Sequence, residues 1–333
     1  MALFERCCSN VRMNTGPHIA FVPNARYPDA RVEVLDERFL QLRLYSASLE
    51  QLASGLRWAE GPVWFGDGRY LLLSDIPNNR ILRWDDTSGA TSVFRAAANN
   101  ANGHVRDRMG RLVSCEHLTR RVTRTEYDGR ISTLADRFEG KRLNSPNDIV
   151  CARDGSLWFT DPSFGIGGHW EGEPAPQELP HSVYRLSPDG QLSCMINDLL
   201  APNGLAFSPD ERELYVIESR AEPHRRLWAW SVGAGGELAH KRLVIDAADG
   251  GALDGMAVDV EGHLWCGWGS TGRVPSEGLD GVRVFDAAGR AMAHIHLPER
   301  CANLCFGGAK MNRLFMAASH SLYALYVNVQ GAA

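Results

Sequence analysis

A polar residue opens a short apolar strand at six places along the chain, and this recurrence limits the folds that the sequence can adopt. The six openings are Glu60-Gly61-Pro62-Val63, Asn102-Gly103-His104-Val105, Asn147-Asp148-Ile149-Val150, Asn203-Gly204-Leu205-Ala206, Asp254-Gly255-Met256-Ala257 and Asn303-Leu304-Cys305-Phe306. Their first residues lie 42 to 56 residues apart. This period is close to the ~40–50 residues of a four-stranded propeller blade.

A second strand follows a turn in every repeat and reads as a nearly continuous apolar run, which is typical of strands buried between packed sheets. These runs are Tyr70–Ser74, Arg111–Cys115, Leu157–Thr160, Leu214–Ile217, Leu264–Gly267 and Leu314–Ala317. A third strand follows in each repeat, and a fourth in all but the last. An unpaired candidate strand, Leu49–Ser54, precedes the first repeat.

We therefore expect an all-β fold, a six-bladed β-propeller in which the N-terminal strand completes the last blade and removes exposed sheet edges. An open β-solenoid is the alternative, but it would need terminal caps that the sequence does not contain. The expected domains are a partly irregular N-terminal extension over residues 1–45, with a short helix near 36–42, and the propeller over residues 46–330.

Two long loops, 162–181 and 269–281, each follow a second strand and should rise over the same rim of the propeller. Long loops in compact domains are usually lids or binding loops.

Composition excludes several partners. The 333 residues carry a net charge of −5, so no basic face indicates nucleic-acid binding. No apolar run reaches the roughly 18 residues of a membrane span, and we expect no secretory signal because the first residues have no long apolar core. The cysteines of the repeat region lie in predicted strands without zinc-knuckle spacing, as expected of small buried side chains in a reducing cytosol. We expect a cytoplasmic monomer or homodimer.

Closing the ring would bring the six opening residues together on one axis. Two of them, Glu60 and Asp254, are carboxylates, and packing these beside amides in a narrow channel is costly unless a cation neutralises them. Oxygen ligands favour Ca²⁺, Mg²⁺ or Mn²⁺ over copper or structural zinc. Such an ion polarises a carbonyl or activates water, which suits hydrolysis of an ester-like bond. The structural alternative is that each polar side chain only bonds a neighbouring backbone.

Other polar residues are weaker candidates. His117 and His320 lie near the end of a second strand and can face the pocket. Asp75, Glu116, Asp161 and Glu218 end the second strand in four repeats, where such residues commonly bond turn backbones; Asp161 precedes the longest loop and is the best placed to reach substrate. The chain has no Gly-x-Ser-x-Gly elbow, Walker A loop or His-Glu-x-x-His motif.

Several motifs in the same order resemble the gluconolactonase/regucalcin family, more specifically its bacterial gluconolactonase branch, from about Tyr27 to the C-terminus. They are Trp58-Ala59-Glu60-Gly61-Pro62-Val63-Trp64, Ser74-Asp75-Ile76-Pro77-Asn78-Asn79-Arg80, Leu143-Asn144-Ser145-Pro146-Asn147-Asp148, Phe159-Thr160-Asp161-Pro162, Pro202-Asn203-Gly204-Leu205-Ala206-Phe207-Ser208-Pro209-Asp210 and Leu253-Asp254-Gly255-Met256.

The resemblance implies a six-bladed propeller that hydrolyses sugar lactones with one divalent ion in its central channel. It assigns the ion to Glu60, Asn147, Asn203 and Asp254, with Asp254 also the general base. Ca²⁺ is the expected ion; Zn²⁺, Mg²⁺ and Mn²⁺ are alternatives.

Regucalcin-type members carry an arginine two residues before the first metal-binding asparagine, as a substrate contact. This chain has Ser145 at that position and Arg142 further upstream. We therefore expect Asn102 and Asn144 to replace that contact, with Asp161 and Arg142 as further candidates for substrate binding.

The expected activity is hydrolysis of a sugar lactone of the glucono-δ-lactone type to the aldonic acid, by a gluconolactonase-type carboxylic ester hydrolase. Three alternatives stay open. The substrate can be the lactone of another aldonic acid, or an organophosphate triester as in the related squid-type phosphatases. A non-catalytic propeller that binds Ca²⁺ is the third.

Overall fold

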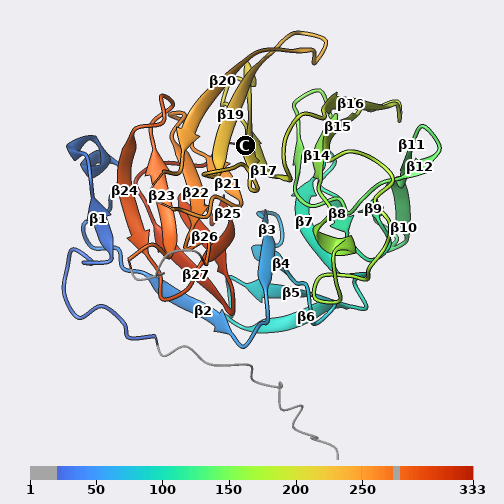
Figure 1. Cartoon of the computed structure of the whole chain (residues 1–333). Coiled ribbons are helices and arrows are strands. Elements are labelled where there is room, and N and C mark those ends of the chain that lie inside the picture. Colours follow the sequence, from blue (N-terminus) through green and yellow to red (C-terminus); the bar gives the residue numbers. More distant parts are fainter. Residues whose placement is uncertain (1–20, 249, 273–277, 333) are drawn as a thin grey trace, which may run out of the picture.

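The computed structural model describes residues 21–248, 250–272 and 278–332, and it confirms the six-bladed β-propeller. Six antiparallel sheets, blades one to six, surround a central axis (Figure 1). Blade one consists of β3 (Ala59–Phe65), β4 (Tyr70–Asp75), β5 (Arg80–Asp85) and β6 (Thr91–Ala96). Blade two consists of β7 (Ala101–Arg106), β8 (Leu112–Glu116), β9 (Arg121–Thr125) and β10 (Ile131–Ala135). Blade three consists of β13 (Ile149–Cys151), β14 (Leu157–Asp161), β15 (Ser182–Leu186) and β16 (Leu192–Ile196).

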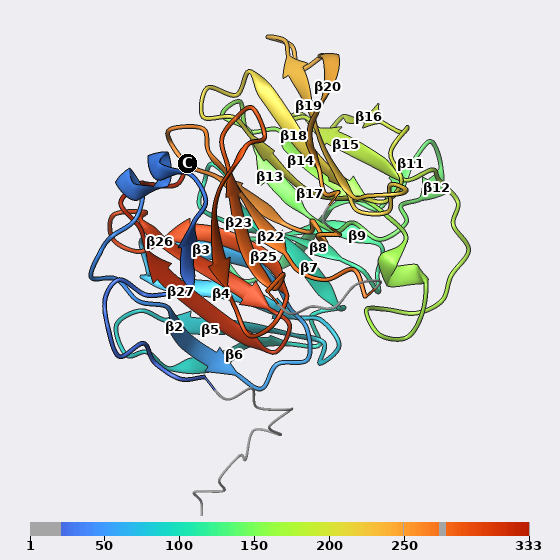
Figure 2. The same cartoon turned by 60° about the vertical axis from the view of Figure 1, so that its left-hand side comes forward.

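The other three blades follow the same order from the axis outward. Blade four consists of β17 (Pro202–Phe207), β18 (Glu213–Glu218), β19 (Arg226–Val232) and β20 (Leu238–Asp246). Blade five contains β21 (Met256–Val258), β22 (Leu264–Trp268), β23 (Gly281–Phe285) and β24 (Ala291–His296). Blade six contains β25 (Cys301–Gly307), β26 (Arg313–Ala318) and β27 (Ser321–Tyr326). The long strands β19 and β20 project beyond the neighbouring blades in both views (Figures 1 and 2).

The N-terminal region closes the ring as predicted. Strand β2 (Glu50–Ser54) pairs antiparallel with β27 and supplies the missing fourth strand of blade six. A second strand, β1 (Val32–Val34), pairs with β24 and makes blade five five-stranded. The sequence analysis missed β1 because three residues are too short to show an alternating pattern. The short helix is a 3₁₀ helix, η1 (Glu37–Gln41), capped by the Asp36 side chain.

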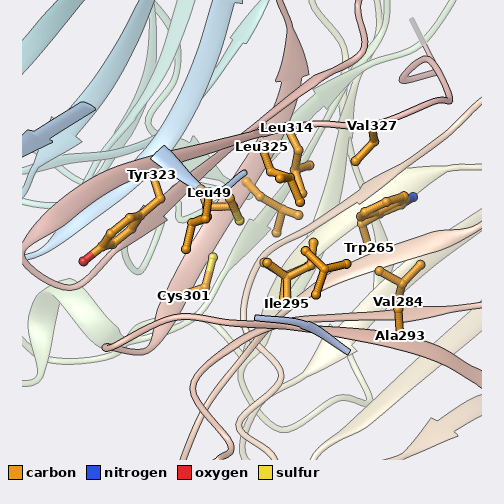
Figure 3. Packing of buried hydrophobic residues seen from close by; sticks show 14 of the residues in the cluster. Leu49, Trp265, Val284, Ala293, Ile295, Cys301, Leu314, Tyr323, Leu325 and Val327 are labelled. Atoms are coloured by element: carbon orange, nitrogen blue, oxygen red, sulfur yellow. The ribbon is translucent and has the colours of Figure 1, made fainter. Parts of the chain in front are cut away.

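Apolar residues from neighbouring blades pack between the sheets. Among the described residues, six buried clusters each join one pair of adjacent blades. The largest lies between blades five and six, where Trp265 and Ile295 of one sheet pack with Leu314 and Leu325 of the other (Figure 3). Leu49 joins this cluster, so burial of apolar area also holds the N-terminal segment in place.

Glycines after the opening residues let the innermost strands approach one another. Gly103 donates its N–H to the Asn147 carbonyl at 2.8 Å, and Gly204 donates to the Asp254 carbonyl at 2.9 Å. A Cβ atom at these positions would lie 2.4 Å and 2.6 Å from the same carbonyl oxygens. Each Asn-Gly pair therefore serves ring closure as well as the placement of its polar side chain.

Six cysteines among the described residues are free thiols; Cys115, Cys266 and Cys301 are buried and Cys151, Cys194 and Cys305 are partly buried. The described part of the chain contains no helix that is long and apolar enough to cross a membrane.

Candidate functional site

A cavity of about 800 Å³ lies where the innermost strands begin. Five of the six opening residues line it: Glu60, Asn102, Asn147, Asn203 and Asp254. All five are buried, with at most 6% of each residue exposed. The four residues predicted to hold a metal thus share one cavity with Asn102, one of the predicted substrate contacts.

The sixth opening residue differs from the expectation that all six meet. Asn303 lines a separate cavity of about 490 Å³, together with later residues of the inner strands such as Val105 and Phe207. Its Oδ1 accepts from the Leu304 N–H at 2.8 Å, and its Nδ2 lies 3.4 Å from Asp148 Oδ2. A Cβ atom on Gly255 would lie 2.3 Å from Asn303 Cγ, so the glycine leaves the space that the Asn303 side chain occupies.

Asp254 is held from two sides. Asn203 donates its Nδ2 to Asp254 Oδ1 at 2.5 Å, and the Arg300 guanidinium donates to Asp254 Oδ2. Arg300 directly precedes β25, and its side chain is 22% exposed in the cavity. The sequence analysis missed Arg300, although it stands three residues before the sixth opening.

Several buried acids lie close together around the axis: Glu60 and Asp254 line the first cavity, and Asp148 lines the second. Burial raises the pKa of Glu60 well above its usual range, and the nearby Asp254 and Asp148 raise it further. Glu60 Oε2 accepts one hydrogen bond, from the Gly61 N–H at 3.0 Å. Burial also raises the pKa of Asp148 to about 7. Carboxyl groups in such surroundings favour either a bound proton or a cation.

The long loop 162–181 reaches the cavity with two residues that the sequence analysis did not name. Phe164 lies on a short 3₁₀ helix, η2 (Phe164–Ile166), and Glu171 follows it. Burial raises the pKa of Glu171 to about 7, and Asp254 adds to the effect. Thr271 of the loop 269–281 lines the same cavity, so the described parts of both predicted loops reach one rim. Residues 273–277 of that loop lie outside the described residues.

His117 supports this wall from behind. It is fully buried, and burial lowers its pKa to about 4, which keeps the imidazole neutral. Its Nε2 lies 3.4 Å from Asn102 Nδ2, and its Nδ1 lies 3.6 Å from Glu171 Oε2. His320 instead contacts Glu299 at 3.2 Å and does not line the cavity.

Three of the predicted substrate contacts, Asn144, Asp161 and Arg142, are not among the residues that line the cavity. Asp161 Oδ2 accepts from the Asn144 backbone N–H at 2.8 Å, and Asn144 donates its Nδ2 to the Leu179 carbonyl at 3.1 Å. Arg142 donates to the Thr119 carbonyl at 3.0 Å. Asn144 and Asp161 thus brace the segment that carries Asn147 and tie it to the end of the long loop.

Asp75, Glu116 and Glu218 likewise act near the turns. Asp75 accepts from the Arg57 N–H at 2.9 Å, and Glu218 from the Leu200 N–H at 2.8 Å. Glu116 accepts from Arg121 Nε at 2.8 Å. The contacts of Asp75 and Glu218 match the structural alternative given above, in which such residues bond turn backbones. Glu116 differs, because the donors to its carboxylate are side chains, among them Asn99 and Arg121.

The donor set at the cavity fits a hard divalent cation. Two carboxylates and two amides converge there, and the uncompensated charge around Glu60 would be relieved by a cation. No group of three His, Cys, Asp or Glu side chains able to hold a metal occurs in residues 21–248, 250–272 and 278–332. The predicted set contains only two residues of those four types, so amide oxygens would have to complete the coordination.

Comparisons with known proteins agree with this architecture. Residues 58–320 match the model of the SMP-30/Gluconolactonase/LRE-like region. A gluconolactonase of Zymomonas mobilis is 32% identical over 83% of this chain and 80% of its own length. A pentonolactonase of Haloferax volcanii is 28% identical over 79% of this chain and 82% of its own length.

A solved gluconolactonase structure from Xanthomonas campestris superposes with a TM-score of 0.81 and 39% identity, over 94% of this chain and 99% of the other. Together with the propeller and the cavity at its axis, these matches show that the chain belongs to the SMP-30/gluconolactonase/LRE-like family.

Proposed function

We propose that this protein hydrolyses a sugar lactone of the glucono-δ-lactone type to the aldonic acid, with a divalent cation bound at the axial cavity. The observation that carries the proposal is that Glu60, Asn147, Asn203 and Asp254 line one cavity. The gluconolactonases among its relatives support the substrate class.

Glu60, Asn147, Asn203 and Asp254 would hold the cation through carboxylate and amide oxygens, and Ca²⁺ is the ion that such ligands suit best. When bound, the cation supplies Lewis-acid polarisation of the lactone carbonyl and stabilises the developing oxyanion.

Asp254 is the residue that we assign as general base. Its carboxylate accepts a proton from the water that attacks the lactone carbonyl. Asn203 and Arg300 fix the orientation of that carboxylate through bonds to its two oxygens. Such positioning of a base before reaction removes part of the entropic cost of catalysis.

Cavity walls complete the site. Trp58 and Phe164 provide apolar surface, while Asn102 offers polar atoms to sugar hydroxyls. Asn102 Oδ1 is buried and has no hydrogen-bond partner among the described residues, so it is available as an acceptor. Its contacts make it the best placed of the predicted substrate ligands.

A five-carbon aldonolactone is a second candidate substrate, because a pentonolactonase is among the relatives. The two candidates share the reacting ester and differ in ring size and in the hydroxyl groups.

The test is the rate of acid release from glucono-δ-lactone and from pentonolactones, after chelation and then with Ca²⁺, Mg²⁺, Mn²⁺ or Zn²⁺ added back. We expect chelation to abolish activity above the spontaneous rate and one divalent ion to restore it. Full activity in metal-free protein would reject the role of the cation, and no activity on any lactone would reject the enzymatic assignment.

A further inference from the structure

An arginine on the cavity wall has no role in the hydrolysis described above. Arg220 follows β18 and lines the cavity together with Asp254 and Glu171. It is an exposed residue whose guanidinium carbon lies 5.4 Å from the centre of the Phe164 ring. Its backbone N–H is bonded to the Leu200 carbonyl at 3.1 Å, so the main chain at this point is fixed.

The other two arginines of the cavity are already engaged. Arg300 pairs with Asp254, and Arg225 donates to the Leu253 carbonyl at 2.8 Å. The Arg220 side chain, in contrast, contacts the Phe164 ring and has no ion pair or hydrogen bond within the part of the chain that the structure describes. A guanidinium that stacks on an aromatic ring keeps its N–H edge free to bind a carboxylate or phosphate through two parallel bonds.

The charge of the lining allows an anion to enter. The cavity lining contains three arginines and four carboxyl groups, those of Glu60, Glu171, Glu222 and Asp254. The formal charge of these seven groups together is therefore −1. The divalent cation of the proposed function would change it to +1. A neutral sugar lactone needs no free guanidinium, whereas a lactone with its own negative charge does.

We propose that Arg220 is a specificity-determining residue that selects sugar lactones bearing an anionic group, a phosphate or a free carboxylate, at the end remote from the reacting ester. This inference rests on the proposed function and names its substrate class. Phe164 holds the guanidinium from the side of the long loop, and the anionic group of the substrate binds the exposed edge.

The test compares kcat/KM for 6-phosphoglucono-δ-lactone, a glucarolactone and glucono-δ-lactone in the metal-loaded protein. We expect the protein to prefer at least one of the two charged lactones, and the preferred one identifies phosphate or carboxylate as the group recognised. Arg220→Gln should lower the ratio of charged to neutral kcat/KM by about 10- to 100-fold, the size of a lost charged hydrogen bond. Arg220→Lys should retain part of the preference.

Arg212→Gln is the matched control. It removes the same charge from blade four, but Arg212 has an 85% exposed side chain and does not line the cavity. The control should leave the ratio unchanged. Calorimetric titration with 6-phosphogluconate, glucarate and gluconate gives a readout independent of turnover. Arg220→Gln should weaken the binding only of the acid that carries the same remote anionic group as the preferred lactone.

The outcomes separate the two proposals. If no lactone is hydrolysed, the proposed function fails. If glucono-δ-lactone is hydrolysed without preference for either charged lactone, only the role of Arg220 fails. An equal loss on charged and neutral lactones in Arg220→Gln would also overturn it, because the arginine would then act on the part that all the substrates share.

Discussion

At the scale of single residues, the site depends on the different surroundings of two carboxylates. Glu60 accepts one backbone N–H and is surrounded by other acids, whereas Asp254 is bonded by Asn203 and Arg300. These surroundings fit the different tasks that we propose for the two residues. A cation bound by Glu60 would lower the electrostatic cost of its buried charge, and Asp254 would receive the proton of the attacking water. Substitutions that keep the shape but remove the charge should therefore have different effects.

We predict that Asp254→Asn lowers kcat/KM by ~10²–10⁴, the usual contribution of a general base, while part of the metal affinity remains. Glu60→Gln should chiefly weaken metal binding, so that excess metal restores part of its activity. Lactone kinetics and calorimetric metal titration on both variants test this. Wild-type-like kinetics in both would place the chemistry elsewhere.

Asp161 gives a pH-dependent prediction. Burial raises its pKa to about 7 in the folded protein, against about 3.9 for an unfolded chain. Between these values the folded state binds more protons than the unfolded state. The contribution of Asp161 to stability is therefore greatest at low pH and is lost as the pH rises through 7. Asp161→Asn removes this titration.

The difference in free energy of unfolding between Asp161→Asn and the wild type should shift in favour of the variant by ~1–3 kcal/mol between pH 5 and pH 8. Denaturant melts at the two pH values measure this shift. A difference that is independent of pH would show that the Asp161 carboxyl does not titrate in this range.

At the scale of the strand, close approach of neighbouring blades sets the position of the cavity. Gly204 shows the constraint, because a Cβ atom there would lie 2.6 Å from the Asp254 carbonyl oxygen. Its neighbour Asn203 donates to the Asp254 side chain, so a shift of one strand would move both residues.

Gly204→Ala should lower the free energy of unfolding by about 1–3 kcal/mol through overpacking, and lower lactonase activity as well. Gly168→Ala is the control, because nothing lies within 4 Å of a Cβ atom at that position. Thermal melts and lactone assays test the pair. A Gly204→Ala protein as stable and active as the control would contradict the close-approach argument.

The sequence predicts the strands better than it predicts the cavity wall. Blade spacing and the lone strand before Glu60 are local patterns, and they lead to the propeller and its closure by β2. The five opening residues at the cavity follow from the same repeat. Arg300, Glu171 and Trp58 reach the cavity from segments between strands, where no periodic pattern exists. The Asn303 side chain occupies space that Gly255 leaves open and lies near Asp148, and a repeat pattern does not report such contacts.

At the scale of the whole molecule, one arginine joins the segments that close the ring. Arg313 on β26 is 6% exposed and bonds Glu50 of β2 at 2.7 Å and Asp86 of blade one at 3.1 Å. Its guanidinium also lies 4.9 Å from the Trp84 ring centre. The Arg313 guanidinium therefore links three parts of the molecule: blade six, the N-terminal strand β2 and blade one.

Arg313→Gln should lower the free energy of unfolding by about 1–3 kcal/mol, because the buried side chain loses its charged hydrogen bonds to Glu50 and Asp86. Asp86 keeps its pair with Arg69 at 2.8 Å, and the Glu50 side chain is 45% exposed, so neither acid becomes a buried unpaired charge. Arg83→Gln is the control: Arg83 pairs with Asp85, but its side chain is 39% exposed, and exposed pairs contribute about 0–1 kcal/mol. Denaturant unfolding compares the two variants. Equal small losses would show that Arg313 is not needed for closure.

The central claim is that one divalent cation binds between Glu60 and Asp254 at the start of the inner strands. The most direct measurement is a crystal structure of the protein grown with Ca²⁺ and a sugar acid. The account predicts an ion about 2.3–2.6 Å from oxygen atoms of Glu60, Asn147, Asn203 and Asp254, with the acid beside it. A cavity without an ion in an active, calcium-saturated protein, or an ion bound elsewhere, would contradict the account.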